Sequence, residues 1–144
     1  MAHAAPASHS PIGTVLLVED EPVERLAASE ALMRAGAREV ASCGTMREAL
    51  AALEHLRPDV VVLDVRLADR SDGWALAELL PLFQPRAPQV IFATATPEAI
   101  PQGVAGLGTI LAKPYVPEDL VALIRGRSGS LAERLRGVFS GDPA

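Results

Sequence analysis

Five polar side chains stand at the ends of short apolar runs, and their types suit phosphoryl chemistry. Glu19 and Asp20 follow "TVLLV", Asp64 ends "VVVLD", Thr94 follows "QVIFA" and Lys113 follows "TILA". Three carboxylates held close together repel one another unless a cation joins them. Carboxylate oxygens and water are the ligands that Mg²⁺ prefers where it is shared with a phosphoryl group. The set therefore predicts a magnesium-dependent phosphoryl site, if folding gathers these residues.

Within such a site the residue types divide by role. A central carboxylate, Asp64, can act as a nucleophile and form an acyl phosphate. The metal and Lys113 would neutralise charge on the phosphoryl oxygens, and the hydroxyl of Thr94 could donate to one of them. Lys113 is the single lysine among 13 basic residues. That choice favours a specific role for a narrow ammonium group.

The order of elements predicts how the five residues could meet. Helix signals separate the apolar runs: Pro22 suits a first helical turn, Gly36 a helix stop, and Thr45 with Glu48 forms a capping box in a helix that Pro58 would end. Strands are predicted at 14–18, 39–43, 60–64, 89–93 and 109–112. Strands alternating with helices indicate an α/β fold with a parallel sheet covered on both faces. Ligands of such sheets bind outside the carboxyl ends of the strands.

The later helices are predicted to be less regular. The segment 72–83 reads as a helix broken at or just after Pro81, and 117–125 as the last helix of the series. Between 96 and 108 there is room for about a turn and a half of helix before Pro101 and Gly103 interrupt it. Thr96 is best interpreted as the N-cap before Pro97.

Composition limits the classes of function. The chain has 144 residues, a net charge of −5 and 49% hydrophobic residues, which predicts one domain with a substantial core and argues against a nucleic-acid surface. No apolar run approaches the length of a membrane span. The single cysteine, Cys43, is compatible with a reducing cytoplasm. We therefore expect a cytoplasmic protein.

Four motifs in order, "LLVEDEP", "VVLDVRL", "FAT" and "AKPY", resemble the receiver domain of two-component response regulators over roughly residues 13–125. The resemblance implies a doubly wound, flavodoxin-like five-stranded sheet of order 2-1-3-4-5. It also implies that Asp64 is the phosphoacceptor, Thr94 the switch hydroxyl and Lys113 the family's invariant lysine. The implied metal ligands are Glu19, Asp20, Asp64 and the backbone carbonyl of Arg66.

The resemblance further implies a signalling role and not that of an enzyme. The expected partners are a sensor histidine kinase or histidine phosphotransfer protein and a downstream protein effector, with no DNA or membrane and with a homodimer left open. "FAT" and "KPY" are similar to single-domain receivers of the FAT-motif type. We predict a disordered tail at 1–12, the receiver at 13–126, and a linker with a short amphipathic C-terminal helix at 127–144.

Some positions depart from the family pattern. Receivers usually carry an aromatic residue three positions before the lysine, where this chain has Ile110, so the usual coupling to the switch hydroxyl is not expected. Tyr115 could take over part of that readout, although packing against the last helix is the simpler interpretation. The side chain of Arg66 could pair with Glu19 or Glu21 or shield a phosphoryl group, and a solvated arginine is an equal alternative. The loop 65–73 lacks the common Leu-Pro and is slightly long.

Three other functions are compatible with parts of this pattern. A receiver-like interaction module that is never phosphorylated would keep the fold and lose the chemistry. A phosphatase working through an aspartyl-phosphate would be expected to carry an aspartate two residues after the nucleophile, where this chain has Arg66. A flavodoxin-type cofactor binder would need a phosphate-cradling loop after the first strand, which the sequence lacks.

Overall fold

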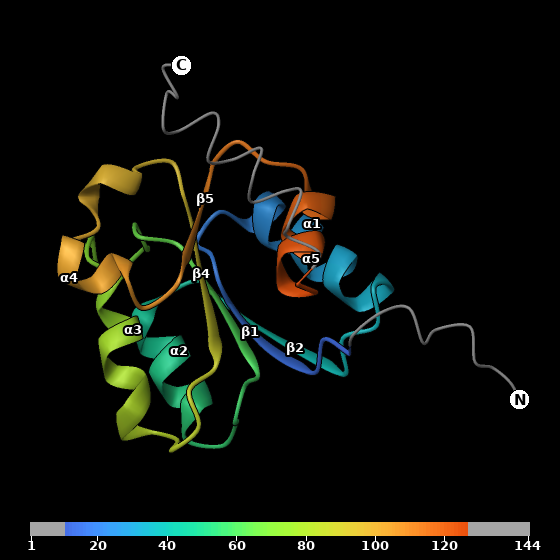
Figure 1. The fold of residues 1–144 in the computed structure, drawn as a ribbon, viewed down its shortest axis with the longest axis horizontal. Coiled ribbons are helices and arrows are strands. Elements are labelled where there is room, and N and C mark those ends of the chain that lie inside the picture. The colour runs from blue at the N-terminus through green and yellow to red at the C-terminus, as the bar shows by residue number, and fades with distance from the viewer. Residues whose placement is uncertain (1–10, 127–144) are drawn as a thin grey trace, which may run out of the picture.

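The computed structural model describes residues 11–126, so the predicted N-terminal tail up to residue 10 and the C-terminal linker and helix lie outside the described residues. Five parallel strands form one sheet in the order β2-β1-β3-β4-β5 (Figure 1). This confirms the doubly wound, flavodoxin-like fold. The strands are β1 (Thr14–Val18), β2 (Glu39–Cys43), β3 (Val60–Leu63), β4 (Gln89–Thr94) and β5 (Thr109–Ala112).

Helices cover both faces of the sheet, in three layers. They are α1 (Pro22–Arg34), α2 (Met46–Leu53), α3 (Ala75–Leu79), α4 (Gln102–Ala105) and α5 (Pro117–Ile124), with two 3₁₀ turns, η2 (Leu80–Leu82) and η3 (Pro97–Ala99). In Figure 1, α1 and α5 lie on one side of the strands, and α2, α3 and α4 lie on the other. Within the described part, no helix combines the length and apolar character needed to cross a bilayer.

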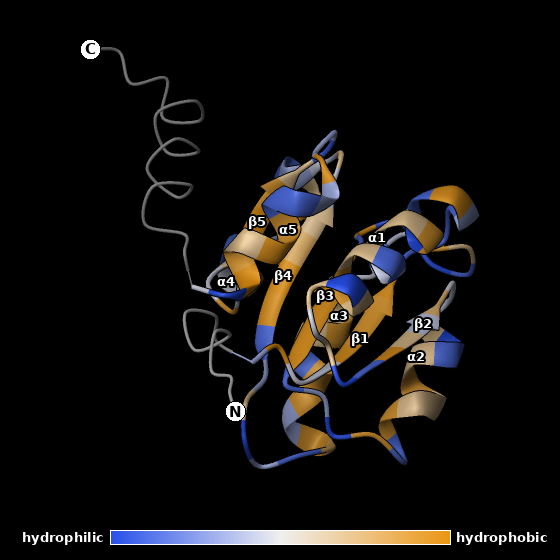
Figure 2. Cartoon of the chain, turned by 90° about the vertical axis from the view of Figure 1, so that its right-hand side faces the viewer, coloured by the Kyte–Doolittle hydropathy of each residue, from blue (hydrophilic) through white to orange (hydrophobic). Residues whose placement is uncertain are grey.

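The sheet divides the core into two apolar clusters. Alternate strand residues enter opposite clusters, for example Leu17 and Val62 toward α1 and α5, and Leu16 and Val61 toward α2 and α3. β1 and β3 are buried at every position, as expected for central strands covered on both faces. β1 and β3 are accordingly strongly hydrophobic in Figure 2. Burial of each large side chain contributes about 1.5–3 kcal/mol, and this burial holds the strands in place.

Strand register aligns the ends that carry the chemistry. Val18 of β1 pairs with Leu63 of β3, so the residues that follow, Glu19 and Asp64, leave the sheet side by side. On the other side, Thr94 of β4 pairs with Ala112 of β5, immediately before Lys113. The parallel pairing therefore brings four of the five predicted chemical positions to one edge.

The first two helices follow the sequence signals closely. α1 begins at Pro22 and ends at Arg34, before Gly36, whose φ of 103° is the left-handed conformation that favours glycine. The hydroxyl of Thr45 accepts from the backbone N–H of Glu48, and the Glu48 carboxylate accepts from the N–H of Gly44. The capping box is therefore formed, with its return bond displaced by one residue. α2 ends at Leu53, so the prediction that Pro58 ends it was wrong: the helix stops several residues earlier.

The third crossover breaks beside Pro81, within one residue of the predicted position. There α3 changes to the 3₁₀ turn η2 at Leu80, because Pro81 lacks an N–H for the next helical bond. The fourth crossover differs from the prediction. In the fourth crossover the helical residues lie on both sides of Pro101, and α4 includes Gly103. Pro101 stands at the N-cap of α4, where a missing N–H costs nothing, so it begins the helix and does not interrupt it.

Ile12 and Gly13 attach the start of the described chain to the core. Ile12, assigned to the tail, has only 3% of its surface exposed and belongs to the cluster under α1 and α5. Gly13 turns the chain with a φ of 80°, and the next N–H, of Thr14, donates to the carboxylate of Asp59 at 2.9 Å. This turn anchors the entry to β1 against the entry to β3.

Candidate functional site

The carboxyl end of β1 supplies two acids with different surroundings. Glu19 is buried, with 4% of its surface exposed, whereas Asp20 is half-buried. One carboxylate oxygen of Glu19 accepts from the backbone N–H of Glu21 at 3.0 Å, and the Glu19 carbonyl accepts from the guanidinium of Arg25 at 2.7 Å. Burial raises the pKa of Glu19 despite these contacts and its bond to Lys113. The site therefore favours an added cation beside Glu19.

Asp64 follows β3 directly and lies at the centre of the strand ends. It is 7% exposed, and its own N–H donates to the carbonyl of Val18 at 3.0 Å. Its Oδ1 atom accepts from the N–H of Val65 at 2.6 Å, while Oδ2 accepts from Lys113. Two different kinds of donor thus fix the two oxygens, and the carboxylate is held in one orientation.

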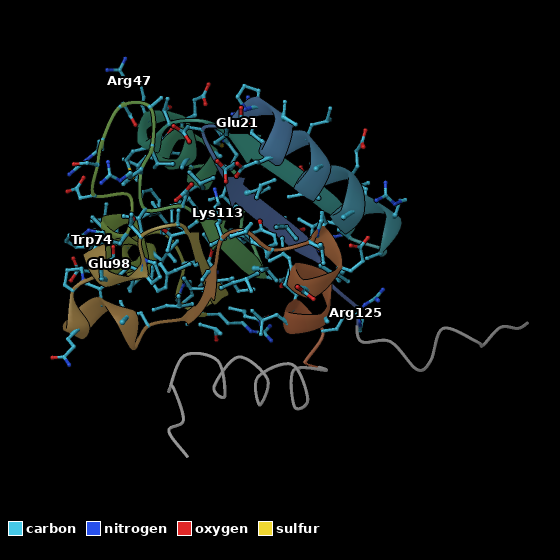
Figure 3. All side chains as sticks on the ribbon, turned by 90° about the horizontal axis from the view of Figure 1, so that it is seen from above. Glu21, Arg47, Trp74, Glu98, Lys113 and Arg125 are labelled. Carbon is cyan, nitrogen blue, oxygen red and sulfur yellow. The ribbon has the colours of Figure 1, made fainter. Side chains whose placement is uncertain are left out.

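Lys113 joins the two sides of the site. Its backbone N–H continues the pairing with β4 by donating to the carbonyl of Thr94, and a cis peptide bond connects it to Pro114. Its Nζ atom donates to Glu19 Oε1 at 2.6 Å and to Asp64 Oδ2 at 2.8 Å. In Figure 3 it lies near the middle of the molecule. Burial would lower the pKa of Lys113, but its carboxylate partners outweigh burial and raise it, so the ammonium stays charged.

Three of the predicted metal ligands lie close enough to share one cation. Glu19, Asp20 and Asp64 each offer a carboxylate oxygen, and these atoms lie within 4.8 Å of one another. A hard divalent cation suits such an all-oxygen set, especially where two of the acids are buried. Among the described residues, Lys113 is the only cation that forms a salt bridge with these acids, and it bonds to two of them. The donor set fits Mg²⁺.

Thr94 lies at the carboxyl end of β4 and is almost fully buried, at 1% exposed. Its hydroxyl accepts from the backbone N–H of Thr96 at 3.0 Å and shares a second hydrogen bond with the Thr96 hydroxyl at 3.2 Å. Thr96 does occupy the N-cap position of η3, as predicted, but its side chain makes no capping bond. The Thr96 hydroxyl turns back to Thr94, so the residue predicted to be the switch is held by the loop that follows it.

Arg66 and Tyr115 differ in how far they enter the site. Arg66 is exposed, and its N–H lies 3.4 Å from Asp64 Oδ1. None of the ion pairs found within residues 11–126 includes Arg66, so the predicted pairing with Glu19 or Glu21 is not formed. Lys113 holds Glu19 and the carboxylate of Glu21 caps α1. Tyr115 packs against the cluster under α1 and α5, in agreement with the simpler of its two interpretations.

Sequence reasoning missed three residues around the site. Glu24, in the first turn of α1, accepts a hydrogen bond from Lys113 at 2.7 Å. Asp69, in the loop after Asp64, caps α2 by accepting from the N–H groups of Met46 and Arg47 at 2.9 and 3.1 Å. Gly73 packs against the backbone just after β3. The sequence does place Glu24 in the first turn of a predicted helix, three residues after Glu21. The contacts of Asp69 and Gly73 join distant segments and leave no signal in the sequence.

Comparison with known proteins finds the same family as the sequence motifs. The family model described as response regulator receiver domain matches residues 15–125. The chain is 38% identical over 116 residues to the probable transcriptional regulatory protein TcrX of Mycobacterium tuberculosis, covering 78% of this chain and 48% of that protein. The chain thus spans about half the length of the first curated relatives that it matches.

Solved structures of receiver domains are also similar. The BeF₃-activated receiver domain of DrrB, from Thermotoga maritima, has a TM-score of 0.65 at 28% identity and covers 77% of this chain and 92% of its own. The receiver domain of the sensor histidine kinase PA1611 from Pseudomonas aeruginosa has a magnesium ion coordinated in its active-site cleft. Its TM-score is 0.62 at 27% identity, with 78% of this chain and 93% of that one covered. The fold, the acidic edge of its sheet and the family match together establish that this chain belongs to the response regulator receiver domain family.

Proposed function

We propose that Asp64 accepts a phosphoryl group from the phosphohistidine of a sensor histidine kinase or a histidine phosphotransfer protein. A carboxylate oxygen of Asp64 attacks phosphorus, an O–P bond forms, the P–N bond breaks, and the departing imidazole nitrogen takes up a proton. The observation that carries this proposal is the 2.8 Å contact between Lys113 Nζ and Asp64 Oδ2 in a pocket with two further acids. An ammonium group there can neutralise charge on a transferred phosphoryl group.

The metal part of the proposal rests on the donor set. Glu19, Asp20, Asp64 and the backbone carbonyl of Arg66 would hold Mg²⁺, which supplies charge neutralisation for the phosphoryl oxygens when bound. Lys113 would orient one oxygen of Asp64, and the Val65 N–H would hold the other. The magnesium named for the PA1611 receiver domain supports this assignment.

We infer that the readout is a change in a protein-binding surface. The hydroxyl of Thr94 would leave Thr96 for a phosphoryl oxygen, and the short elements η3 and α4 would then shift between two packings. A phosphoryl group can shift the equilibrium between the two packings only by the difference between its contacts in them. The exchange of these two hydrogen bonds therefore contributes to the free-energy difference between the two packings. The downstream partner is proposed to be a protein effector, and the location the cytoplasm.

The test is phosphorylation by a small phosphoramidate donor in the presence and absence of Mg²⁺. The wild type should gain the mass of one phosphoryl group only with Mg²⁺, and hydroxylamine should remove it, as for an acyl phosphate. Asp64→Asn keeps the shape of the acceptor, removes the nucleophile and should gain nothing. Asp72→Asn, which removes an exposed carboxylate paired with Arg70, serves as the matched control.

The outcomes separate the proposed function from its rival. A phosphoryl group on Asp64→Asn at the wild-type level would place the acceptor elsewhere. No Mg²⁺-dependent modification of the wild type, together with no binding of fluoroberyllate, would favour the receiver-like interaction module that is not phosphorylated.

A further inference from the structure

All three protons of the Lys113 ammonium are already in use. An ammonium group has three N–H donors, and Lys113 Nζ bonds to Glu19 Oε1 at 2.6 Å, Glu24 Oε1 at 2.7 Å and Asp64 Oδ2 at 2.8 Å. Any phosphoryl oxygen that takes a hydrogen bond from Lys113 must therefore displace one of these carboxylates. The carboxylate that is displaced from Lys113 should be the one held least firmly.

The three partners are not held equally. The side chains of Glu19 and Asp64 are 6% and 10% exposed, and each also accepts a backbone N–H. The side chain of Glu24 is 52% exposed, and within residues 11–126 its carboxylate has no recorded hydrogen bond except that from Lys113. Glu24 also lines a groove of about 290 Å³ with Lys113, Pro114 and Tyr115, which leaves it room to move away. Asp64 would itself carry the phosphoryl group, and of the two partners that stay unmodified, Glu24 is held less firmly than Glu19.

We propose that Glu24 is a positioning residue that competes with the phosphoryl group for Lys113. This inference rests on the proposed function of Asp64 and Lys113. In the unphosphorylated receiver Glu24 holds the third donor of Lys113, and in the phosphorylated receiver that donor turns to a phosphoryl oxygen. Glu24 thus stabilises the unphosphorylated state relative to the phosphorylated one.

The charge of Glu24 predicts opposite effects on two ligands. It adds a fourth carboxylate next to Glu19, Asp20 and Asp64, so it favours a bound cation. The same charge repels an anionic phosphoryl group and occupies the donor that this group needs. Removing the charge should therefore weaken Mg²⁺ binding and strengthen binding of a phosphoryl analogue, whereas simple structural damage would weaken both.

The experiment measures Mg²⁺ alone, and then fluoroberyllate at saturating Mg²⁺, by isothermal titration calorimetry. Glu24→Gln keeps the side-chain shape and should bind fluoroberyllate roughly two- to fivefold more tightly than the wild type, the range expected for a partly exposed ion pair. Its Mg²⁺ affinity should fall. Glu30→Gln is the matched control: it removes the same charge from an exposed position of the same helix and should match the wild type.

Glu24→Asp separates contact with Lys113 from charge alone. Lys113 is fixed by two buried carboxylates, so it cannot follow a side chain shortened by one methylene. Glu24→Asp should therefore bind fluoroberyllate more tightly than the wild type, whereas its retained charge should keep Mg²⁺ binding at the wild-type level. Wild-type fluoroberyllate affinity of Glu24→Asp would overturn the positioning role in favour of long-range charge. Unchanged or weaker fluoroberyllate binding by Glu24→Gln would overturn the competition itself. Failure of the wild type to bind fluoroberyllate would instead reject the proposed function.

Discussion

The substitution Gly73→Ala should disturb the proposed acceptor site, because the added methyl group has no room there. A Cβ atom at residue 73 would lie 2.7 Å from the carbonyl oxygen of Val65, closer still to that of Asp64, and 3.0 Å from a methyl carbon of Leu67. Ordinary contact begins at 3.4 Å, so the two backbone segments must separate by about 0.7 Å at Val65 and further at Asp64. Two of the three obstacles are backbone atoms, which cannot rotate away.

The expected cost follows from two contributions. Forcing an extra methyl group into a filled site costs about 1–3 kcal/mol. The N–H of Gly73 donates to the Val65 carbonyl at 2.6 Å, and losing such a bond adds about 1 kcal/mol. Gly73→Ala should therefore lower the free energy of unfolding by about 2–4 kcal/mol. Because the displaced atoms belong to Asp64 and Val65, fluoroberyllate binding should weaken even where the variant is fully folded.

The assay is urea unfolding followed by far-ultraviolet circular dichroism, with the midpoint compared at an unchanged slope. Gly103→Ala is the matched control, because a Cβ at residue 103 meets nothing within 4 Å and the residue lies in helix α4. Alanine is the better helix former, so this control should gain up to about 1 kcal/mol. A Gly73→Ala protein within about 0.5 kcal/mol of the wild type would refute the reasoning.

Two further predictions concern residues near the site. Hydrogen bonds from Met46 and Arg47 hold the pKa of Asp69 below its ordinary value of 3.8, so its stabilising contribution is present above that value and is lost as the pH falls through the lower one. Asp69→Ala should therefore lower the urea midpoint at neutral pH but not in strong acid, and equal midpoints at pH 7 would contradict the cap. Burial raises the pKa of Tyr115 to about 12 from its ordinary 10, so absorbance titration of this single tyrosine should show a late transition. Ionisation near pH 10 in the folded protein would show that the ring is exposed.

Local patterns in the sequence determined the fold class and placed the candidate site residues at the carboxyl edge of the sheet. The apolar runs that became β1, β3 and β4 are continuous because both faces of a covered parallel sheet are buried, and this is a property of the chain itself. The polar residue at each run's end then had to reach the carboxyl edge. The resemblance of the motifs, and not the periodicity, supplied the strand order.

Tertiary structure alone decided which side chains contact one another at the carboxyl edge of the sheet. The bond from Lys113 to Glu24 joins residues 89 positions apart, and the cap that Asp69 gives to Met46 spans 23 positions. Such contacts depend on where packing places each helix and loop, and helical or strand periods carry no information about it. The same holds for Gly73, whose φ is unremarkable for any residue and whose need for glycine comes from a neighbouring backbone. The sequence determined which polar residues reach the carboxyl edge of the sheet, because the hydrophobic pattern determines which segments are buried as strands. Three-dimensional packing decided which of those residues contact one another.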